Sequence, residues 1–364
     1  MDKTKIYIVS WYGTNDVGGL ERVTQYMIDA WQDKYDIDII DFAMIEKNRK
    51  YINWLHKHYV IDGIVVSLFA KQLQKKAPNA KFVTQGYNAP FIRSDLAFLH
   101  GTMRGYKIAL EGSHAKWHMN QLYEKWGMKN AKCVVAVGRH VKDEAVQLYH
   151  ISEAKIEVIE NCVDSNTFFP VRADRSKEIY RILFVGRLEI RKGLQALIEL
   201  AKRIENSEEC ELHIAVNSKA NVELFKGFQN TTIIQGLQKE QMNEFYNKGS
   251  VMYFPSLYEG FEMVTMECLS AGVPVIGNDV GAVGDLYARG QEGVEILSSD
   301  IRENLRKMKA LSEQYKEMEM RQKLHEDIKC KYDLSRYKEK LGVVWERFKD
   351  WGGYCKPLFC ISFG

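Results

Sequence analysis

Residues 181–204 read RILFVGRLEIRKGLQALIELAKRI and combine three patterns in one stretch. A short apolar run is typical of a buried strand, a basic loop with two glycines follows it, and apolar residues then recur at helical spacing. Residues 5–31, KIYIVSWYGTNDVGGLERVTQYMIDAW, repeat the same order of strand, glycine loop and helix. Two such stretches predict two halves that each open like a Rossmann-type domain.

Apolar runs of strand length alternate with helical patterns through most of the chain, which predicts an α/β fold with parallel sheets covered by helices on both faces. Helical patterns include residues 19–35 and 114–128. The expected strands are residues 5–11, 35–42, 63–69, 81–86, 132–138 and 155–160 in the first half, and 181–186, 210–216, 231–236, 251–256, 273–277 and 293–297 in the second.

The length of 364 residues exceeds what one hydrophobic core usually reaches, so we expect two domains. The polar stretch 164–178 contains Pro170 and is expected to link them. We place an N-terminal domain at 1–165 and a C-terminal domain at 166–334. A last helix with an apolar tail, residues 335–364, is expected to pack back on the N-terminal domain.

Charge is distributed unevenly along the chain. Residues 68–140 contain twelve Lys or Arg against three Asp or Glu, whereas the formal net charge of the whole chain is +3. A basic face of this kind attracts an anionic membrane surface, a phosphorylated acceptor or nucleic acid, and the alternative is a solvated surface of uneven charge. No nucleic-acid-binding module accompanies the segment, so nucleic acid is the weakest of these partners.

The cysteines and the first residues favour a cytoplasmic protein. Seven cysteines form no CxxC pair, which argues against a disulfide framework and a zinc site. The N-terminus enters a strand pattern without an apolar signal segment, and no apolar run approaches the ~18–20 residues of a membrane span. We expect a reducing compartment and at most peripheral contact with the inner face of a membrane.

Glycine-bearing loops follow several of the expected strands, where ligands bind in doubly wound sheets. Gly18 and Gly19 precede a helix pattern, so the backbone there can come close to an anion. Residues 278–285, NDVGAVGD, form a similar loop later in the chain. The alternative for each loop taken alone is a tight turn.

A basic loop, residues 186–193, follows the strand that opens the second half. Its cations Arg187, Arg191 and Lys192 stand between Gly186 and Gly193. A pyrophosphate requires fixed positive charge together with backbone donors at a helix start. The alternative is a solvated basic turn.

Residues 258–275, YEGFEMVTMECLSAGVPV, place three carboxylates at a junction of loop, helix and strand. Glu259 and Glu267 have seven residues between them. A carboxylate accepts two hydrogen bonds side by side, which suits the vicinal hydroxyls of a sugar. The backbone N–H groups of residues 261–265 are expected to point outward at the helix start and to bind sugar or phosphate oxygens. Glu267 within an apolar run is costly unless it is paired or functional.

A metal site is not expected. Asp36 and Asp38 have the DxD spacing that can chelate a metal, but they alternate with apolar residues and are expected on a half-exposed strand. No other cluster of Asp, His or Cys has the pattern of a metal site.

In their order along most of the chain, these motifs resemble the retaining GT4 family of glycosyltransferases, which has the GT-B fold. The matching stretches are KIYIVS with GGLERV, VVAVGRHVKDEAVQLYHISEAKIEVIENCVD, RILFVGRLEIRKGL, PSLYEGFEMVTMECLSAGVPVI and NDVGAVGDL. The resemblance implies two Rossmann-like domains that face a central cleft, with 1–165 as the acceptor-binding domain and 166–334 as the nucleotide-sugar-binding domain. It also implies a group 1 glycosyltransferase of surface polysaccharide or glycolipid synthesis.

The resemblance further implies a role for each matching residue. Arg187 and Lys192 would neutralise the departing diphosphate in place of a metal, and Glu259 would lie beside the anomeric carbon of the donor sugar. Glu267 would hold the ribose hydroxyls. The remaining donor-binding residues would be Gly18, Gly19, Gly186, Gly260, Phe261, Glu262, Met263, Val264 and Thr265.

The chain departs from the family at several positions. Many relatives carry a histidine in the N-terminal loop that KFVTQGYN resembles, where this chain has Gln85 and Gly86. The acceptor-side candidates are therefore Gln85, Gly86 and His114. Glu262 stands where relatives favour glycine, and we expect it to adapt the site to a particular sugar.

The resemblance thus implies a retaining, metal-independent hexosyl- or N-acetylhexosaminyltransferase without a cofactor. It would move a sugar from a nucleotide sugar, first of all a UDP-sugar, to a hydroxyl of a glycan or lipid-linked acceptor. The alternatives are a GT-B protein that binds glycan or nucleotide without catalysis, and a nucleotide-sugar epimerase or a phosphorylase of the same architecture. An epimerase would require further acid and base residues, which the sequence does not provide.

Overall fold

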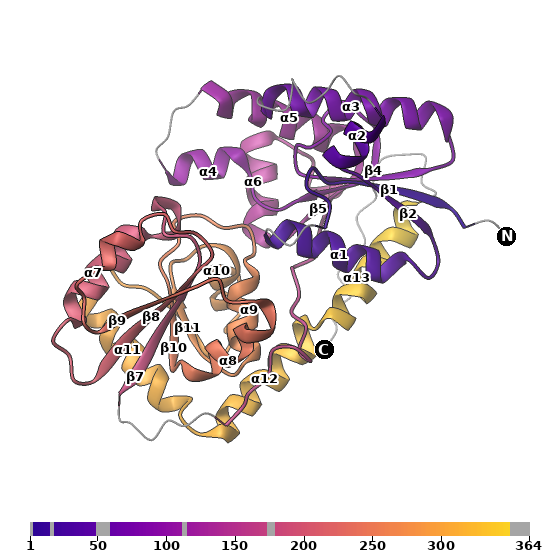
Figure 1. Ribbon diagram of the computed structural model, residues 1–364. Helices are drawn as coiled ribbons and strands as arrows, with labels where there is room; N and C mark the ends of the chain where they lie inside the picture. The colour runs from indigo at the N-terminus through magenta and orange to yellow at the C-terminus, as the bar shows by residue number, and fades with distance from the viewer. Residues whose placement is uncertain (1–2, 15–17, 49–58, 111–114, 173–178, 350–364) are drawn as a thin grey trace. The chain divides into compact units, whose positions relative to one another are not determined.

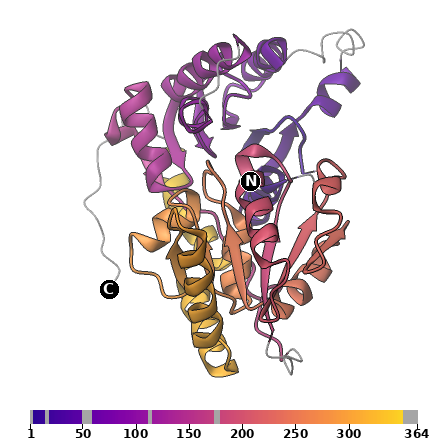
Figure 2. The same ribbon diagram turned by 90° about the vertical axis from the view of Figure 1, so that its left-hand side faces the viewer.

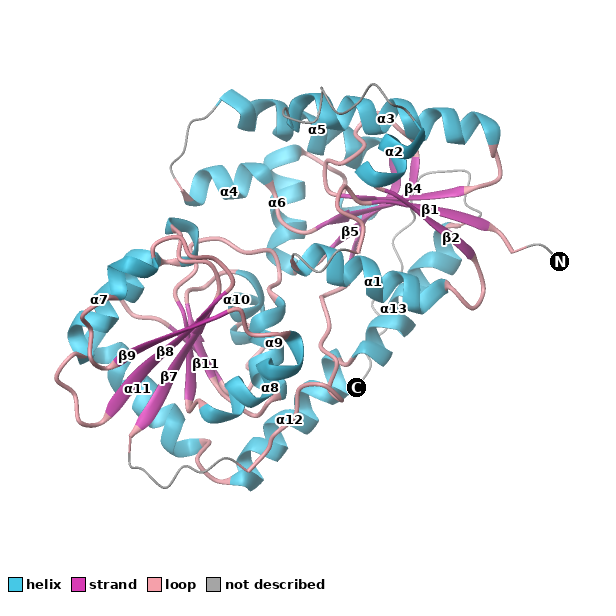
Figure 3. Ribbon diagram, in the orientation of Figure 1, coloured by secondary structure: helices cyan, strands magenta, loops and turns pink. Residues whose placement is uncertain are grey.

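The computed structural model describes residues 3–14, 18–48, 59–110, 115–172 and 179–349. It divides into two compact units. Unit 1 comprises residues 1–161 and 337–364, and unit 2 comprises residues 162–336. Figure 3 shows that each unit is built as a layer of strands between helices.

Unit 1 contains a six-stranded parallel sheet in the order β2-β1-β3-β4-β5-β6. Because the chain passes from β1 to β2 and then crosses back to β3, the direction of winding reverses between β1 and β3. The strands are β1 (Lys5–Val9), β2 (Asp36–Ile40), β3 (Lys81–Gln85), β4 (Ser94–Leu99), β5 (Ala131–Ala136) and β6 (Ile156–Val158).

Helices cover both faces of this sheet (Figure 1). Right-handed crossovers place α1 on one face and the helices that follow β2, β4 and β5 on the other. The helices that begin in the first half are α1 (Gly19–Trp31), α2 (Phe42–Asn48), α3 (Tyr59–Lys76), α4 (Met103–Ala109), α5 (Ala115–Asn130) and α6 (Arg139–Tyr149), with a short 3-10 turn η1 (Glu153–Lys155).

The last helix, α13 (Leu334–Phe348), belongs to unit 1 from Tyr337 onward. The Trp345 ring lies 4.8 Å from that of Trp31 on α1. Lys340 pairs with Glu160 at 3.1 Å. Apolar and ionic contacts therefore hold α13 against unit 1. The expected tail from residue 350 lies outside the described residues.

The expected strand at residues 63–69 is wrong, because this run lies within α3 (Tyr59–Lys76). A short apolar run does not distinguish a buried strand from a buried helix. Val66 and Ala70 are fully buried four residues apart, whereas Ile64 and Leu68 are exposed, which is a helical pattern.

Strand β4 (Ser94–Leu99) was not expected from the sequence. All of its residues are buried, but it begins with two polar residues, so its sequence lacks the apolar run typical of a buried strand. Asp95 is satisfied there because it accepts the backbone N–H of Phe82 at 2.8 Å and pairs with Lys132 at 2.7 Å. A paired carboxylate is tolerated inside a sheet that an unpaired one would disrupt.

Unit 2 contains a six-stranded parallel sheet in the order β12-β11-β10-β7-β8-β9. Counted from β7, this is the Rossmann order 3-2-1-4-5-6, and the winding reverses between β7 and β10. The strands are β7 (Tyr180–Val185), β8 (Cys210–Val216), β9 (Thr231–Gln235), β10 (Val251–Phe254), β11 (Val275–Gly277) and β12 (Val294–Ile296).

The helices of unit 2 also lie on both faces of its sheet, with α7 and α11 on one side and α8, α9 and α10 on the other (Figure 1). They are η2 (Ile190–Lys192), α7 (Leu194–Ile204), η3 (Val222–Phe225), α8 (Lys239–Lys248), α9 (Met263–Ser270), α10 (Gly281–Tyr287), α11 (Ile301–Gln314) and α12 (Met318–Tyr332).

The segment expected as a linker packs along unit 2 as far as the structure describes it, to residue 172. The Ser165 hydroxyl donates to Asp333 at 2.5 Å, and the Val171 N–H donates to Asn247 at 2.6 Å. Its polar composition reflects hydrogen bonding to α8 and to the end of α12. The change of unit lies earlier, between Asn161 and Cys162.

Two further findings concern surfaces. Asp36 and Asp38 lie on β2 as expected, and Lys5 pairs with both, at 2.9 and 2.8 Å. Among the described residues, no helix is both long enough and apolar enough to cross a bilayer.

Candidate functional site

The candidate site of unit 2 lies where two loops leave the adjacent strands β7 and β10, at the reversal point of the sheet. Gly193 joins the first loop to α7 with φ +77°, and a Cβ there would collide with the backbone carbonyl of Pro255. The Leu257 N–H donates to the Arg191 carbonyl at 2.7 Å. Only glycine permits this approach, so the two loops hold each other in place.

A cluster of charges occupies this junction. Oε1 of Glu259 accepts from Nζ of Lys192 at 2.7 Å and from Nη1 of Arg191 at 2.8 Å. The same Nη1 donates to the Tyr258 carbonyl at 3.1 Å. The three charged side chains are only 10–16% exposed. Because water screens them little, their interactions are stronger than those of surface ion pairs.

Arg187 stands at the edge of the cluster. Its side chain is 63% exposed and pairs with Glu189 at 3.2 Å, and Glu189 also pairs with Arg191 at 3.2 Å. The structure therefore brings Lys192 and Glu259 into direct contact. Arg187 is connected to Arg191 only through Glu189. Arg191 belonged to the expected basic loop but not to the expected site residues, although its position beside Lys192 could have indicated it.

Glu262 connects this site to the next loop. It is the N-cap residue of α9, and its Oε1 accepts from the Thr265 hydroxyl at 2.6 Å. Its Oε2 accepts the backbone N–H of Ala282 at 2.8 Å, in the first turn of α10. Gly281 has φ +59°, and a Cβ there would collide with the Glu262 carboxylate. The glutamate at this position therefore caps the N-terminus of α10.

The ionisation of Glu262 is perturbed by this location. Burial, with the charge of Glu259 as a second cause, raises its pKa to about 7. Its role in selecting a donor sugar stays a prediction, whereas its role as a cap of α10 follows from the contacts.

The other predicted donor-binding residues of unit 2 lie in the same two loops and in α9. Glu267 lies inside α9 and is 3% exposed, and it accepts from the Tyr246 hydroxyl at 2.9 Å. Thr265 is fully buried, and Val264 is half-buried. Gly186 follows β7, and a Cβ there would stand 3.8 Å from the Lys192 side chain. Also buried are Gly260, Phe261 and Met263. The ribose role of Glu267 stays a prediction.

Unit 1 carries different chemistry at its own reversal point, between β1 and β3. Gln85, the last residue of β3, is fully buried, and its amide nitrogen donates to the Thr24 hydroxyl at 3.3 Å. Gly18 and Gly19 are exposed at the N-terminus of α1, and Gly86 has φ +54° with open space around it. His114 lies outside the described residues.

The sequence reasoning missed His100, which follows β4 directly. Its Nε2 lies 2.5 Å from Oε1 of Gln85. Because the Gln85 nitrogen donates to Thr24, its oxygen accepts, so the proton of the neutral imidazole is on Nε2 and Nδ1 is an acceptor. Burial lowers the pKa of His100 to about 4, so the ring is neutral near pH 7. The residue was missed because β4 was not expected.

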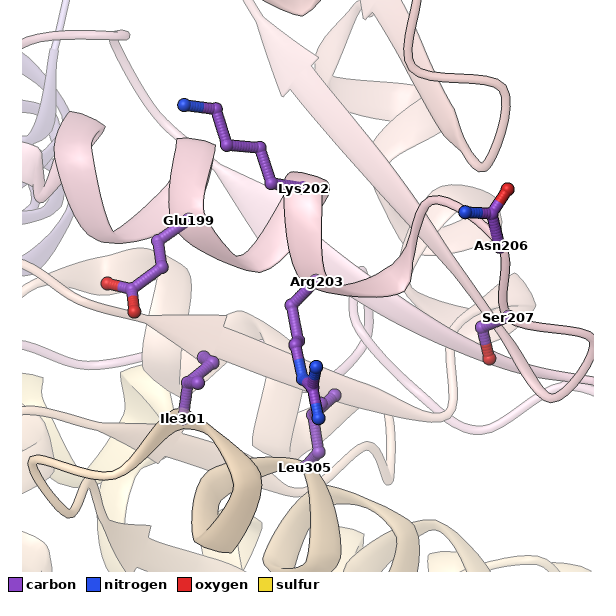
Figure 4. A pocket seen from close by; sticks show the side chains of 7 residues that line it. All are labelled: Glu199, Lys202, Arg203, Asn206, Ser207, Ile301 and Leu305. Carbon is purple, nitrogen blue, oxygen red and sulfur yellow. The ribbon is translucent and has the colours of Figure 1, made fainter.

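Unit 2 has a separate open pocket of about 680 Å³ between α7 and α11 (Figure 4). None of its lining residues belongs to the loops that follow β7 and β10. Arg203 extends toward Leu305 there, whereas Lys202 points away from α11. The lining is Glu199, Lys202, Arg203, Asn206, Ser207, Ile301 and Leu305.

Comparison with known proteins agrees with this architecture. Residues 17–167 match the family described as Glycosyltransferase Family 4, and residues 179–314 match the one described as Glycosyl transferases group 1. Glycogen synthase of Mycobacterium tuberculosis is 24% identical over 233 residues, which are 60% of this chain and 53% of that protein. The match thus spans about half the length of this curated relative.

Solved structures show the fold. Sucrose-phosphate synthase from Thermosynechococcus elongatus has a TM-score of 0.74 at 16% identity, over 95% of this chain and 99% of that one. Anabaena HepE in complex with UDP-glucose has a TM-score of 0.68 at 13% identity, over 94% and 99% of the two chains. The fold is therefore GT-B, and the chain belongs to the group 1, family 4 glycosyltransferases.

Proposed function

We propose that this chain transfers a sugar from a UDP-sugar to a hydroxyl of a glycan or lipid-linked acceptor. Membership of the family supports glycosyl transfer as the class of reaction. The observation that carries the assignment of the site is the buried cluster of Arg191, Lys192 and Glu259 at the reversal point of unit 2.

The cluster suits a diphosphate. Three cations, Arg187, Arg191 and Lys192, face two carboxylates, Glu189 and Glu259, which leaves a surplus of one positive charge. Arg191 and Lys192 are buried, so water screens their charges little. Phosphate oxygens accept charge-assisted hydrogen bonds from such groups, about twice as strong as neutral ones. We assign the diphosphate of the donor to Arg191, Lys192 and Arg187.

The same charges would promote the reaction. The bond between the anomeric carbon and the diphosphate oxygen breaks, a bond to the acceptor oxygen forms, and the proton of the acceptor hydroxyl passes to the departing diphosphate. Negative charge develops on the departing diphosphate, where Lys192 and Arg191 stabilise it. Glu259 is held in one orientation by both cations, as a group that addresses a sugar hydroxyl must be. Our proposal includes retention at the anomeric carbon and no metal or cofactor.

Unit 1 would supply groups for neutral hydroxyls. Gln85 and the neutral imidazole of His100 form a polar pair at its reversal point. Amide and imidazole groups recognise hydroxyls by hydrogen bonds and bring no net charge. We therefore place sugar or acceptor hydroxyls at unit 1 and the charged part of the donor at unit 2.

The uridine base and the pathway rest on relatives. HepE is bound to UDP-glucose in its structure, and glycogen synthase is by its name an enzyme of polysaccharide synthesis. We extend these properties to this chain as a cytoplasmic enzyme that builds a surface polysaccharide or glycolipid.

Thermal-shift measurements with UDP-, GDP-, ADP- and dTDP-sugars test the donor on the intact chain. A ligand that binds the folded state raises the melting temperature by mass action. We expect a UDP-sugar to raise it, Lys192→Ala to abolish the rise and Arg203→Ala, in the separate pocket, to preserve it. A panel without any shift would contradict donor binding, and binding without nucleotide release in the presence of acceptors would favour a non-catalytic protein.

A further inference from the structure

Helices α3 and α5 lie side by side over the same face of the unit 1 sheet (Figures 1 and 2). Their close packing depends on Gly63 of α3, where a Cβ would stand 3.2 Å from the ring of Tyr123 on α5. Both helices belong to crossovers of the same hand and direction, so their outer sides face away from the sheet together. We call this side the α3–α5 face.

Large apolar side chains are exposed on the α3–α5 face. Leu68 is 53% exposed and Ile64 38% on α3, while Leu122 is 39% and Trp126 38% exposed on α5. On each helix the two residues are four positions apart and thus form one stripe. Exposed apolar residues are ordinary when scattered, but four of them on two adjacent helices mark a contact surface.

All charges exposed on the same two helices are positive. Exposed or half-buried lysines accompany the apolar stripe: Lys71, Lys75 and Lys76 on α3, and Lys125 and Lys129 on α5. The acids of these helices point inward, since Asp62 is 4% and Glu124 3% exposed. Within the part of the chain that the structure describes, none of the five lysines forms an ion pair.

We infer that the α3–α5 face docks the chain on an anionic phospholipid surface. Leu68, Ile64, Leu122 and Trp126 would enter the headgroup region, where tryptophan is favoured, and the lysines would contact lipid phosphates. Interfaces between proteins are depleted in lysine, which argues against a second copy of this chain. A nucleic-acid surface would not require the aliphatic stripe. The inference does not depend on which donor the chain uses.

Sedimentation with phospholipid vesicles tests the face on the intact chain. We expect binding to vesicles of equal parts phosphatidylglycerol and phosphatidylcholine, weakening with salt, and little binding to phosphatidylcholine alone. Each lysine near an anionic surface strengthens binding roughly fivefold, so Lys71→Glu with Lys75→Glu should weaken it well over tenfold. Leu68→Ser with Trp126→Ser should weaken it severalfold, because less apolar area enters the lipid.

The matched control is Lys3→Glu with Lys34→Glu, which makes the same change of charge at exposed positions near the end of α1. It should bind vesicles like the unchanged chain. Equal binding by the face variants, or no binding to anionic vesicles, would overturn the inference.

Two more outcomes would also overturn it: tight binding of single-stranded DNA that the charge variant alone abolishes, and a dimer in solution that Leu68→Ser dissociates. Thermal shifts by UDP, measured on every variant, separate this result from the proposed function. A variant that loses vesicle binding but keeps the thermal shift by UDP bears on the α3–α5 face alone and leaves the proposed function unaffected.

Discussion

The reversal points of the two sheets share a topology and differ in chemistry. In unit 2, the cations Lys192 and Arg191 both pair with the carboxylate of Glu259. In unit 1, the equivalent position holds a neutral amide and a neutral imidazole, Gln85 and His100. A parallel sheet determines where a ligand binds, and the loops determine which ligand it is.

The difference also concerns how the groups are held. The loops of unit 2 contact each other through backbone at Gly193 and Pro255, so charged side chains extend from a fixed framework. In unit 1, side chains position one another, since Gln85 bonds both Thr24 and His100. The division predicts that mutations of Arg191, Lys192 or Glu259 change donor binding and catalysis, and that mutations of Gln85 or His100 change transfer alone.

The largest effect is expected for Glu259→Gln. The substitution keeps the size of the side chain but leaves Arg191 and Lys192 without their shared carboxylate. We expect the transfer rate, measured as UDP release with acceptor present, to fall roughly 100- to 1,000-fold. Glu211→Gln is the control, because Glu211 pairs with Arg181 and His213 outside the two loops of the site. A Glu259→Gln variant that transfers at the normal rate would remove the catalytic assignment.

Glu262→Gln should change how stability depends on pH. In the folded chain the pKa of Glu262 is raised from 4.5 to about 7. Between these values the unfolded chain releases the proton and the folded chain keeps it, so a rise in pH lowers the free energy of unfolding. The Glu262→Gln variant has no carboxyl to titrate, so it lacks this decrease in the free energy of unfolding. The decrease amounts to at most about 3 kcal/mol between the two pKa values.

Melting temperatures across the range from pH 4.5 to 8 measure the difference between the variant and the unchanged chain. The unchanged chain should lose stability relative to Glu262→Gln as the pH rises toward 7. Parallel curves for the two proteins would contradict the burial of a titrating carboxyl beside Glu259.

A smaller effect is expected for His100→Ala in unit 1. The change removes an uncharged hydrogen-bonding group, for which a tenfold loss of kcat, about 1.4 kcal/mol, is reasonable. Binding of UDP should not change. His213→Ala in unit 2, away from both loops, serves as the control. Weakened UDP binding in His100→Ala would break the proposed division between the units.

The smallest effect is expected for Arg187→Ala. Its side chain is 63% exposed, so solvent and salt screen its charge. We expect UDP to bind about threefold more weakly, with the difference diminishing at high salt. A loss as large as that for Lys192→Ala would mean that Arg187 moves into the cluster when the donor binds.

Much of this organisation could be predicted from the sequence. The strand, loop and helix of residues 181–204 appear as expected. Lys192 and Glu259, singled out separately from the sequence, form an ion pair. The GT-B fold follows from the order of such units. These features are local, because apolar periodicity and glycine positions reflect the backbone directly.

Other features depend on partners far away in the sequence. The cap that Glu262 provides requires Ala282, and the hydrogen bond of His100 requires Gln85 at the end of another strand. Residues 63–69 lie in a helix whose Gly63 faces the ring of Tyr123 on α5, a contact that no local pattern indicates. Long-range packing decided each of these outcomes.

The central claim is that the cations of unit 2 bind the diphosphate and that Gln85 and His100 of unit 1 do not. Titration calorimetry of UDP into the intact chain, Lys192→Ala and His100→Ala tests it in one set of measurements. The account predicts a dissociation constant at least about tenfold higher for Lys192→Ala, the loss of one charge-assisted contact, and an unchanged one for His100→Ala. Equal affinity of Lys192→Ala and the unchanged chain would contradict it.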